Sequence, residues 1–171
     1  MSSPRIVPRK EYSLIFVRRR TQCGEKEVLL GVKLRGFGEG KLNGYGGKRD
    51  AGESMLSCAV RELKEESGLS IGPNSLDHVA SLEFHMSSLL LMSVEVFLCD
   101  YAACSGVEIE TDEMKPRWTL ESELPALFQQ KLTWPDDEFW LPRTLAGERL
   151  SGRFKYRDDA DIESCTISSI E

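Results

Sequence analysis

The sequence has 171 residues, of which 40% are hydrophobic and 29% are charged, and its formal net charge is −6. This length predicts a single domain spanning residues 1–171, and the hydrophobic fraction excludes an intrinsically disordered chain. The longest run without a charged residue, residues 84–94, is too short for the roughly 20 residues of a membrane-crossing helix. The acidic balance argues against sequence-independent binding to nucleic acid, which needs a basic face.

The first segments in chain order predict a hairpin and then a helix. Residues 12–17 and 28–32 are rich in strand-forming residues, and a short turn separates them. A glycine-rich segment, 36–52, follows and is too dense in glycine for a regular helix. Residues 54–67 then carry apolar side chains at spacings of three and four, and Gly68 stands where a glycine typically ends a helix.

The second half of the chain is predicted to contain several strands and one helix. The helix runs from Thr133-Trp-Pro135 toward Gly147, with Pro142 disturbing its first turns. The strands are expected at 77–84, 89–98, 115–119, 152–156 and 165–170. This order of elements predicts an α/β fold, with helices packed on a mixed β-sheet.

The cysteines and the N-terminal residues bear on the compartment. Five cysteines are an odd number with no C-x-x-C pair, which is typical of reduced thiols in a cytoplasmic protein. His78 and His85 lack the spacing of a zinc site and are expected to be ordinary strand or loop residues. Residues 1–11 lack the apolar core of a secretory signal and are expected to be a flexible segment. We expect a cytoplasmic monomer, with nuclear and mitochondrial pools left open.

Glycines and glutamates meet at one place in the chain. Seven of the 14 glycines lie in the 17 residues from Gly36 to Gly52, and this segment leads directly into the predicted helix. In that helix Glu62, Glu65 and Glu66 are spaced i, i+3 and i+4, so their carboxylates project from one face. A solvated acidic face is the simpler interpretation of three glutamates alone. Beside exposed backbone N–H groups they favour Mg²⁺ carrying a polyphosphate, because hard cations take oxygen ligands.

The same residues carry a family resemblance. Gly47, Glu53 and residues 61–69 (Arg-Glu-Leu-Lys-Glu-Glu-Ser-Gly-Leu) match the Nudix box at each of its specified positions. The chain therefore resembles the Nudix hydrolases, enzymes in which metal-activated water cleaves a diphosphate linked to another group. The resemblance implies the Nudix fold, an α/β/α sandwich around a mixed sheet, and Mg²⁺ as the cofactor with Mn²⁺ as a substitute.

The resemblance also implies roles within the site. The implied metal ligands are the carbonyl of Gly46 and the side chains of Glu62, Glu65, Glu66 and Glu113. The implied catalytic group is Glu62, Glu66, Glu113 and Arg61, with the base left open between Glu66 and Glu113. Gly47 lets the backbone approach metal and phosphate closely. Arg61 is expected to orient Glu53 or another carboxylate of the box, and Glu53 is either a scaffold residue or a ligand.

Residues outside the box are more specific about the substrate. Segments 35–40, 43–48, 112–118, 134–137 and 152–156 resemble the eukaryotic MutT homologues, a Nudix branch that hydrolyses oxidised purine nucleoside triphosphates. This resemblance implies hydrolysis of 8-oxo-dGTP, and of 2-hydroxy-dATP, to the monophosphate and pyrophosphate, which sanitises the nucleotide pool and prevents DNA damage. The implied partner is a small nucleotide, with no stable nucleic-acid complex and no membrane.

The implied substrate-binding residues divide by task. Asn43, Asp136 and Asp137 are expected to read the edge of the base, because two neighbouring carboxyls accept from N–H groups and donate when they share a proton. Trp134 is expected to stack on the purine. The other residues expected at the substrate are Ser13, Lys33, Phe37, Tyr45, Gly46, Gly47, Lys48, Met92, Pro135 and Trp140.

Other interpretations stay open at this point. Leu42 and Leu82 stand where the branch has aromatic residues, and Tyr45 adds a hydroxyl to its aromatic position. Without the resemblance, residues 134–137 would be interpreted as a helix start and Asn43 as a turn residue. The alternative functions are a Nudix hydrolase of methylated purine nucleotides, ADP-ribose or dinucleoside polyphosphates, and a non-catalytic nucleotide-binding sensor.

Overall fold

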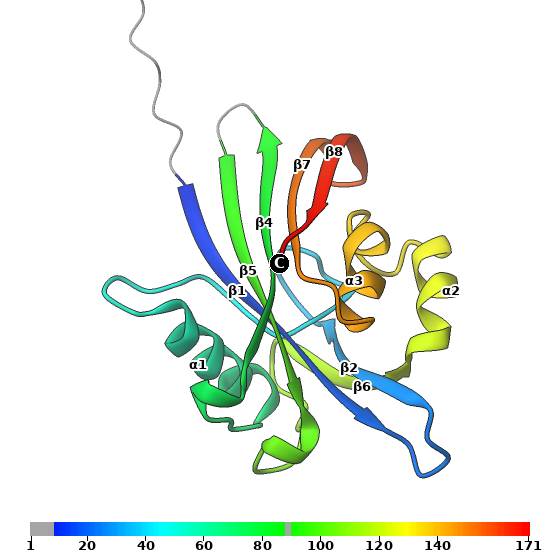
Figure 1. Ribbon diagram of the computed structural model, residues 1–171. Helices are drawn as coiled ribbons and strands as arrows, with labels where there is room; N and C mark the ends of the chain where they lie inside the picture. Colours follow the sequence, from blue (N-terminus) through cyan, green and yellow to red (C-terminus); the bar gives the residue numbers. More distant parts are fainter. Residues whose placement is uncertain (1–8, 88–89) are drawn as a thin grey trace, which may run out of the picture.

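The computed structural model describes residues 9–87 and 90–171 (Figure 1). The strands are β1 (Arg9–Arg20), β2 (Lys26–Lys33), β3 (Leu42–Asn43), β4 (Asp77–Ser87), β5 (Leu90–Asp100), β6 (Met114–Leu120), β7 (Leu150–Asp158) and β8 (Asp161–Ser169). The helices are α1 (Met55–Ser67), α2 (Leu124–Gln129) and α3 (Asp137–Leu145).

The strands form one mixed sheet. Their order is β3-β2-β1-β5-β4-β7-β8, and β6 pairs with β2 beside this path. The pairs β1–β5 and β4–β7 are parallel, whereas β1–β2, β4–β5 and β7–β8 are antiparallel. The predicted hairpin is confirmed by the antiparallel β1–β2 pair, and the predicted mixed sheet is confirmed by the whole order.

Two hydrophobic clusters lie on opposite faces of the sheet because side chains alternate along a strand. On β1, Ile15 and Val17 belong to the cluster that includes Leu63 of α1, whereas Phe16 belongs to the cluster that includes Trp140 of α3. Figure 1 shows α1 on one side of the sheet and α2 and α3 on the other. The predicted α/β/α sandwich is therefore confirmed.

Helix α1 begins and ends as its sequence predicts. The Ser54 hydroxyl oxygen accepts a hydrogen bond from the Ser57 N–H (3.1 Å), which caps the first turn. Gly68 ends the helix with φ 79°, a left-handed conformation that favours glycine. Leu63 is fully buried on the sheet side, so the acidic face of the helix is fixed in direction by its apolar face.

Several boundaries differ from the sequence prediction. Residues 1–8 and Leu89 lie outside the described residues, and the predicted flexible segment is wrong for Arg9–Glu11, which form the start of β1. Helix α3 begins at Asp137, so Pro135 precedes the helix instead of occupying its first turn. Strand β3 and helix α2 were not predicted, because two and six residues are too few to show a period.

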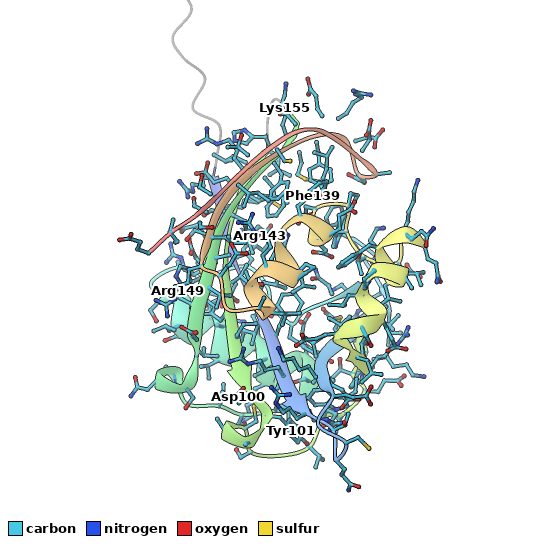
Figure 2. All side chains as sticks on the ribbon, turned by 45° about the vertical axis from the view of Figure 1, so that its right-hand side comes forward. Asp100, Tyr101, Phe139, Arg143, Arg149 and Lys155 are labelled. Atoms are coloured by element: carbon cyan, nitrogen blue, oxygen red, sulfur yellow. The ribbon has the colours of Figure 1, made fainter. Side chains whose placement is uncertain are left out.

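Asp100 and Tyr101 lie at the end of β5, and Lys155 of β7 lies at the opposite end of the molecule (Figure 2).

Among residues 9–87 and 90–171, no helix has the length and apolar character needed to cross a membrane. All five cysteines are free, and His78 and His85 both lie in β4 as ordinary strand residues.

The packing of α1 on the sheet can be tested without touching the site. We expect Leu63→Ala to lower the free energy of unfolding by about 2–5 kcal/mol, because it leaves a cavity at a fully buried position. Leu56→Ala on the same helix is the matched control, since Leu56 is 40% exposed. Chemical denaturation measures both values, and equal losses would contradict the assignment of Leu63 to the core.

Candidate active site

The glycine-rich loop approaches β1 so closely that side chains are excluded. The Ser13 N–H donates to the Gly47 carbonyl (3.0 Å), and a Cβ at Gly46 would overlap the Ser13 carbonyl oxygen. The Gly46 N–H donates to the Glu66 carboxylate (3.0 Å), and a Cβ at Gly47 would overlap the Glu62 carboxylate. The loop therefore forms a cradle against two of the three predicted glutamates.

Arg61 organises the carboxylates at the start of α1. Its Nε and Nη2 donate to the two oxygens of Glu53 at 2.8 and 2.9 Å, and this pairing lowers the pKa of Glu53 to about 2. Its Nη1 donates to Glu62 at 2.7 Å and to Glu65 at 3.3 Å. This geometry supports the scaffold interpretation of Glu53 and places Arg61 as the residue that orients the box carboxylates.

A second group of charges surrounds Glu66. Its side chain is buried, and burial raises its pKa to about 7, with the nearby Lys33 opposing the shift. Lys33 Nζ lies 3.8 Å from Glu66 and 3.4 Å from Glu113. Arg35 also donates to Glu113 (3.1 Å), and these cations lower the pKa of Glu113. The two candidate general bases therefore differ: Glu66 is buried and has a raised pKa, whereas Glu113 is half-buried and has a lowered pKa.

The donors around the loop fit a hard divalent ion. They are carboxylates of Glu62, Glu65 and Glu66 and the Gly46 carbonyl, which accepts no hydrogen bond from the residues described in the structure. No three His, Cys, Asp or Glu side chains of residues 9–87 and 90–171 converge on a preformed metal site. Arg61 and Lys33 lie among these carboxylates as the protein's own cations, so an ion would have to compete with them.

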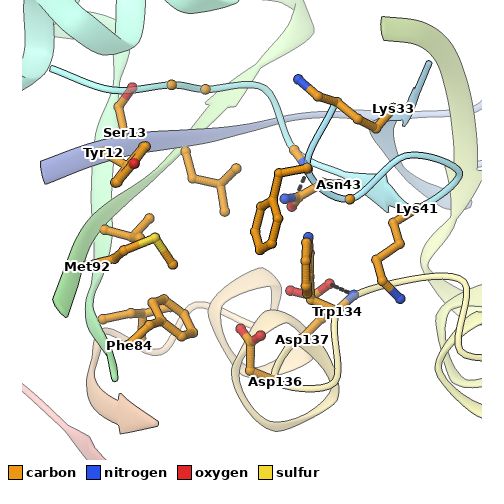
Figure 3. Close-up of a pocket in the computed structure, with 18 of the residues that line it drawn as sticks. Tyr12, Ser13, Lys33, Lys41, Asn43, Phe84, Met92, Trp134, Asp136 and Asp137 are labelled. Carbon is orange, nitrogen blue, oxygen red and sulfur yellow. Dashed lines mark hydrogen bonds between the residues drawn. The ribbon is translucent and has the colours of Figure 1, made fainter. Parts of the chain in front are cut away.

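A cavity of about 610 Å³ runs from this cluster toward α3. Its volume is in the range of small-molecule sites. Figure 3 shows Phe84 and Met92 on one wall, Trp134 on the other, and Asp136 at the base. The predicted residues in its lining are Ser13, Lys33, Phe37, Asn43, Gly46, Gly47, Glu66, Met92, Glu113, Trp134, Asp136, Asp137 and Trp140.

Two buried aspartates close the far end of the cavity. Asp136 accepts hydrogen bonds from the Trp140 indole N–H (2.7 Å) and from the Tyr156 hydroxyl. Asp137 accepts from the Trp134 backbone N–H (2.9 Å). Burial raises the pKa of both carboxyls, and that of Asp137 lies well above its usual range because the Asp136 charge adds to the shift.

The aromatic residues at the mouth contact one another. The Phe37 ring stacks on the Trp134 ring, with centroids 4.9 Å apart, and Phe37 is 63% exposed. Lys41 Nζ lies 5.3 Å from the centre of the Trp134 ring. The Asn43 side-chain oxygen accepts from the Gly44 N–H (2.8 Å), a local turn contact, while the residue also lines the cavity. The turn interpretation of Asn43 is therefore confirmed, and its place in the lining leaves contact with the substrate base as a prediction.

Three predicted substrate contacts lie outside the cavity. Tyr45 is fully buried in the cluster beneath α1, and its hydroxyl donates to the Leu30 carbonyl, so the prediction is wrong for this residue. Its bridge to Ile15 of β1 turns it away while its neighbours Gly44 and Gly46 face the cavity. Lys48 is exposed and Pro135 lies beside the helix start, and neither lines the cavity.

Other lining residues were not predicted, although one had a signal. Phe84, Lys41 and Tyr156 all line the cavity. In β7 every second residue from Leu150 to Tyr156 is buried, so strand alternation alone would have placed Tyr156 on the inner face. Lys41 lies in the irregular loop and had no such signal.

The cradle at Gly47 yields a direct test. We expect Gly47→Ala to lower kcat/KM by about 100-fold while the fold is kept, because the new Cβ displaces the Glu62 carboxylate. Gly72→Ala is the matched control, since nothing lies within 4 Å of a Cβ there. Steady-state kinetics and circular dichroism measure the two effects. Wild-type kinetics in Gly47→Ala would contradict the cradle.

The fold and the site define an enzyme that acts on a compound carrying phosphate, because an apolar cavity opens beside a glycine cradle and a carboxylate cluster. Residues 8–143 match the NUDIX domain family. The chain belongs to the Nudix family of hydrolases, whose members generally need divalent metal ions.

Individual relatives agree with this assignment. The chain is 37% identical over 161 residues to the oxidized purine nucleoside triphosphate hydrolase of Mus musculus, covering 94% of this chain and 95% of the mouse protein. It is 39% identical over 145 residues to the protein of that name from Danio rerio, covering 84% and 88%. The MutT protein of Bacillus halodurans shares the fold, with a TM-score of 0.73 at 20% identity over 93% of this chain and 97% of that one.

Proposed function

We propose that this protein hydrolyses oxidised purine nucleoside triphosphates, 8-oxo-dGTP above all and 2-hydroxy-dATP as well, to the monophosphate and pyrophosphate. The observation that carries the proposal is the pair of buried carboxyls, Asp136 and Asp137, at the end of an apolar cavity whose mouth adjoins Glu66. The mouse and zebrafish relatives, named for that activity, support it over most of both chains.

The end of the cavity at Asp136 and Asp137 suits a guanine ring, whose hydrogen-bonding edge is the same in guanine and 8-oxoguanine. That base presents N–H donors and a neighbouring carbonyl acceptor, and a carboxylate beside a protonated carboxyl complements this edge. Trp134 and Phe37 offer aromatic faces for the ring, and Met92 and Phe84 complete the apolar walls. Leu82, in place of the expected aromatic residue, also lines the cavity, so this one position beside Phe84 is aliphatic.

The phosphate end suits proton abstraction from water. We assign the general base to Glu66, because its carboxyl is buried beside the loop at Gly46 and, in the metal-free protein, burial raises its pKa to about 7. Glu113 is half-buried and paired with Lys33 and Arg35, so we assign it to holding those cations, together with any metal, beside the phosphates. When bound, Mg²⁺ or Mn²⁺ supplies positive charge that stabilises charge on the phosphates.

Further parts of the proposal concern the setting. We propose that the protein acts as a monomer in the cytoplasm on a small nucleotide, without a stable nucleic-acid or membrane complex. The five free cysteines suit a reducing compartment, and the net charge of −6 suits a substrate that arrives with its metal ion.

The experiment that tests the activity is a screen for Mg²⁺-dependent release of pyrophosphate. The substrates are normal and oxidised dNTPs, methylated purine nucleotides, ADP-ribose and dinucleoside polyphosphates, and Glu62→Gln serves as the inactive control. We expect the highest kcat/KM for 8-oxo-dGTP. Preferred turnover of another nucleotide would support the alternative Nudix substrate, and tight binding without turnover would support a sensor.

A further inference from the structure

Tyr156 connects β7 to the aspartate pair. Its side chain is 3% exposed, and its hydroxyl donates to one oxygen of Asp136. The other oxygen of Asp136 accepts from the Trp140 indole at 2.7 Å. Two donors from two different elements, β7 and α3, therefore converge on a single buried carboxyl.

These donors restrict where a proton can reside. An indole N–H only donates, so the Asp136 oxygen that faces Trp140 must be an acceptor. A proton on the other oxygen would have to point at Tyr156 and turn the hydroxyl proton away from Asp136, which loses a hydrogen bond to a charged acceptor. The ionised form of Asp136 is the one that satisfies both neighbours.

Asp137 has the opposite surroundings. It accepts one hydrogen bond, from the Trp134 backbone N–H, and its raised pKa reflects burial and the charge of Asp136. The charged and titratable groups that face the pair are Lys41, from the loop before β3, and Tyr156, from β7. Because the charge of Asp136 acts on Asp137, the two buried carboxyls titrate together, and within residues 9–87 and 90–171 no side chain donates a hydrogen bond to Asp137.

We propose that Tyr156 is a positioning residue that sets base specificity: by donating to Asp136 it keeps that carboxyl an acceptor and assigns the shared proton to Asp137. The proposal rests on the proposed function. Its consequence is a preference for bases that present N–H donors to Asp136 and a carbonyl to Asp137. In 8-oxoguanine and 2-hydroxyadenine the carbonyl and the amino group stand in opposite order along this edge, so the two bases need the proton on different carboxyls.

The test is the binding of nucleoside monophosphates, which isolates the base pocket from the hydrolytic step. Isothermal titration calorimetry with 8-oxo-dGMP and with 2-hydroxy-dAMP, from pH 5 to pH 9, compares wild type with Tyr156→Phe, which keeps the ring and removes the hydroxyl. The matched control is Tyr101→Phe. The Tyr101 hydroxyl also donates to a carboxylate, Glu108 (2.8 Å), but Tyr101 follows the end of β5 (Figure 2) and is not among the residues that line the cavity.

We expect Tyr156→Phe to weaken binding of 8-oxo-dGMP about tenfold and to narrow its preference over 2-hydroxy-dAMP by a similar factor. The acidic limb of its pH profile should move to higher pH, because Asp136 loses a donor to its ionised form. Tyr101→Phe should match wild type. Equal weakening of both nucleotides with an unmoved pH profile would overturn the role of Tyr156. Failure of the wild type to bind 8-oxo-dGMP would overturn the proposed function itself, and this inference with it.

Discussion

We expect Glu66→Gln to lower kcat by about 10²–10⁴-fold, because glutamine keeps the shape of the side chain and cannot take a proton. The glutamine oxygen can still accept from the Gly46 N–H, so the cradle is kept. In the wild type the ionised carboxylate is the active form, so kcat/KM should rise with pH as Glu66 loses its proton. Burial raises the pKa of Glu66 to about 7 in the metal-free protein, and a bound cation would lower it and move this rise to lower pH. The measurement is a pH–rate profile of pyrophosphate release for both proteins.

Although Glu66→Gln should lower activity, it should raise the stability of the metal-free protein above neutral pH. In metal-free protein the folded-state pKa of Glu66 is raised from 4.5 to about 7, so the unfolded chain releases this proton first as pH rises. The contribution of Glu66 to the free energy of unfolding is therefore fully present below pH 4.5. It falls by about 1–3 kcal/mol as the pH rises from 4.5 to 7. Glu66→Gln removes this loss and should be more stable than wild type at pH 8 and no different at pH 4.

Urea denaturation in EDTA measures this difference, and Glu65→Gln is the matched control. Glu65 lies one position away with a side chain 58% exposed, so its neutralisation should change the stability of the metal-free protein little. Added Mg²⁺ should restore the wild type and leave Glu66→Gln unaffected. A variant that is less stable than wild type at pH 8 would contradict the burial of an unfavourable charge.

The fold could be predicted where the sequence contains a full period or a cap. Helix α1 had both, with apolar residues at helical spacing, Ser54 before it and Gly68 after it, and its bounds agree closely with the prediction. Strand β3 is two residues long, and α2 contains a proline near its start, so neither had enough residues to show a pattern. Tertiary contacts, not local preference, define these short elements.

The parts of the site that could be predicted are those that the spacing of residues along the chain defines. The i, i+3, i+4 pattern placed three glutamates on one helix face, and the resemblance implied that Arg61 orients a carboxylate of the box. No spacing could show that Lys33 would lie beside Glu66. Tyr45 was misplaced because its direction is set by a single bridge to Ile15, a contact between segments thirty residues apart. To predict that Tyr156 of β7 lines the cavity would have required the order of the strands in the sheet as well as the alternation of buried residues along β7.

Replacing Asp136 by asparagine should lower activity far more than replacing Asp137. Asp136→Asn should lower kcat/KM for 8-oxo-dGTP by about 10²–10³-fold, whereas Asp137→Asn should stay within about tenfold of wild type. An amide at position 136 would direct N–H hydrogens at Trp140 or Tyr156, which already donate to those oxygens. An amide at position 137 can accept from the Trp134 N–H and still offer a donor to the base.

The pH profile separates this explanation from a merely structural one. Asp137 is competent when protonated, and its pKa is raised, so wild-type kcat/KM should fall as pH rises through that value. The Asp137→Asn variant carries a permanent donor and should lose this alkaline limb, while the limb that belongs to Glu66 persists. Thermal unfolding shows whether each variant keeps the fold. Equal losses for the two asparagine variants, or an alkaline limb that survives in Asp137→Asn, would mean that the shared proton does not reside on Asp137.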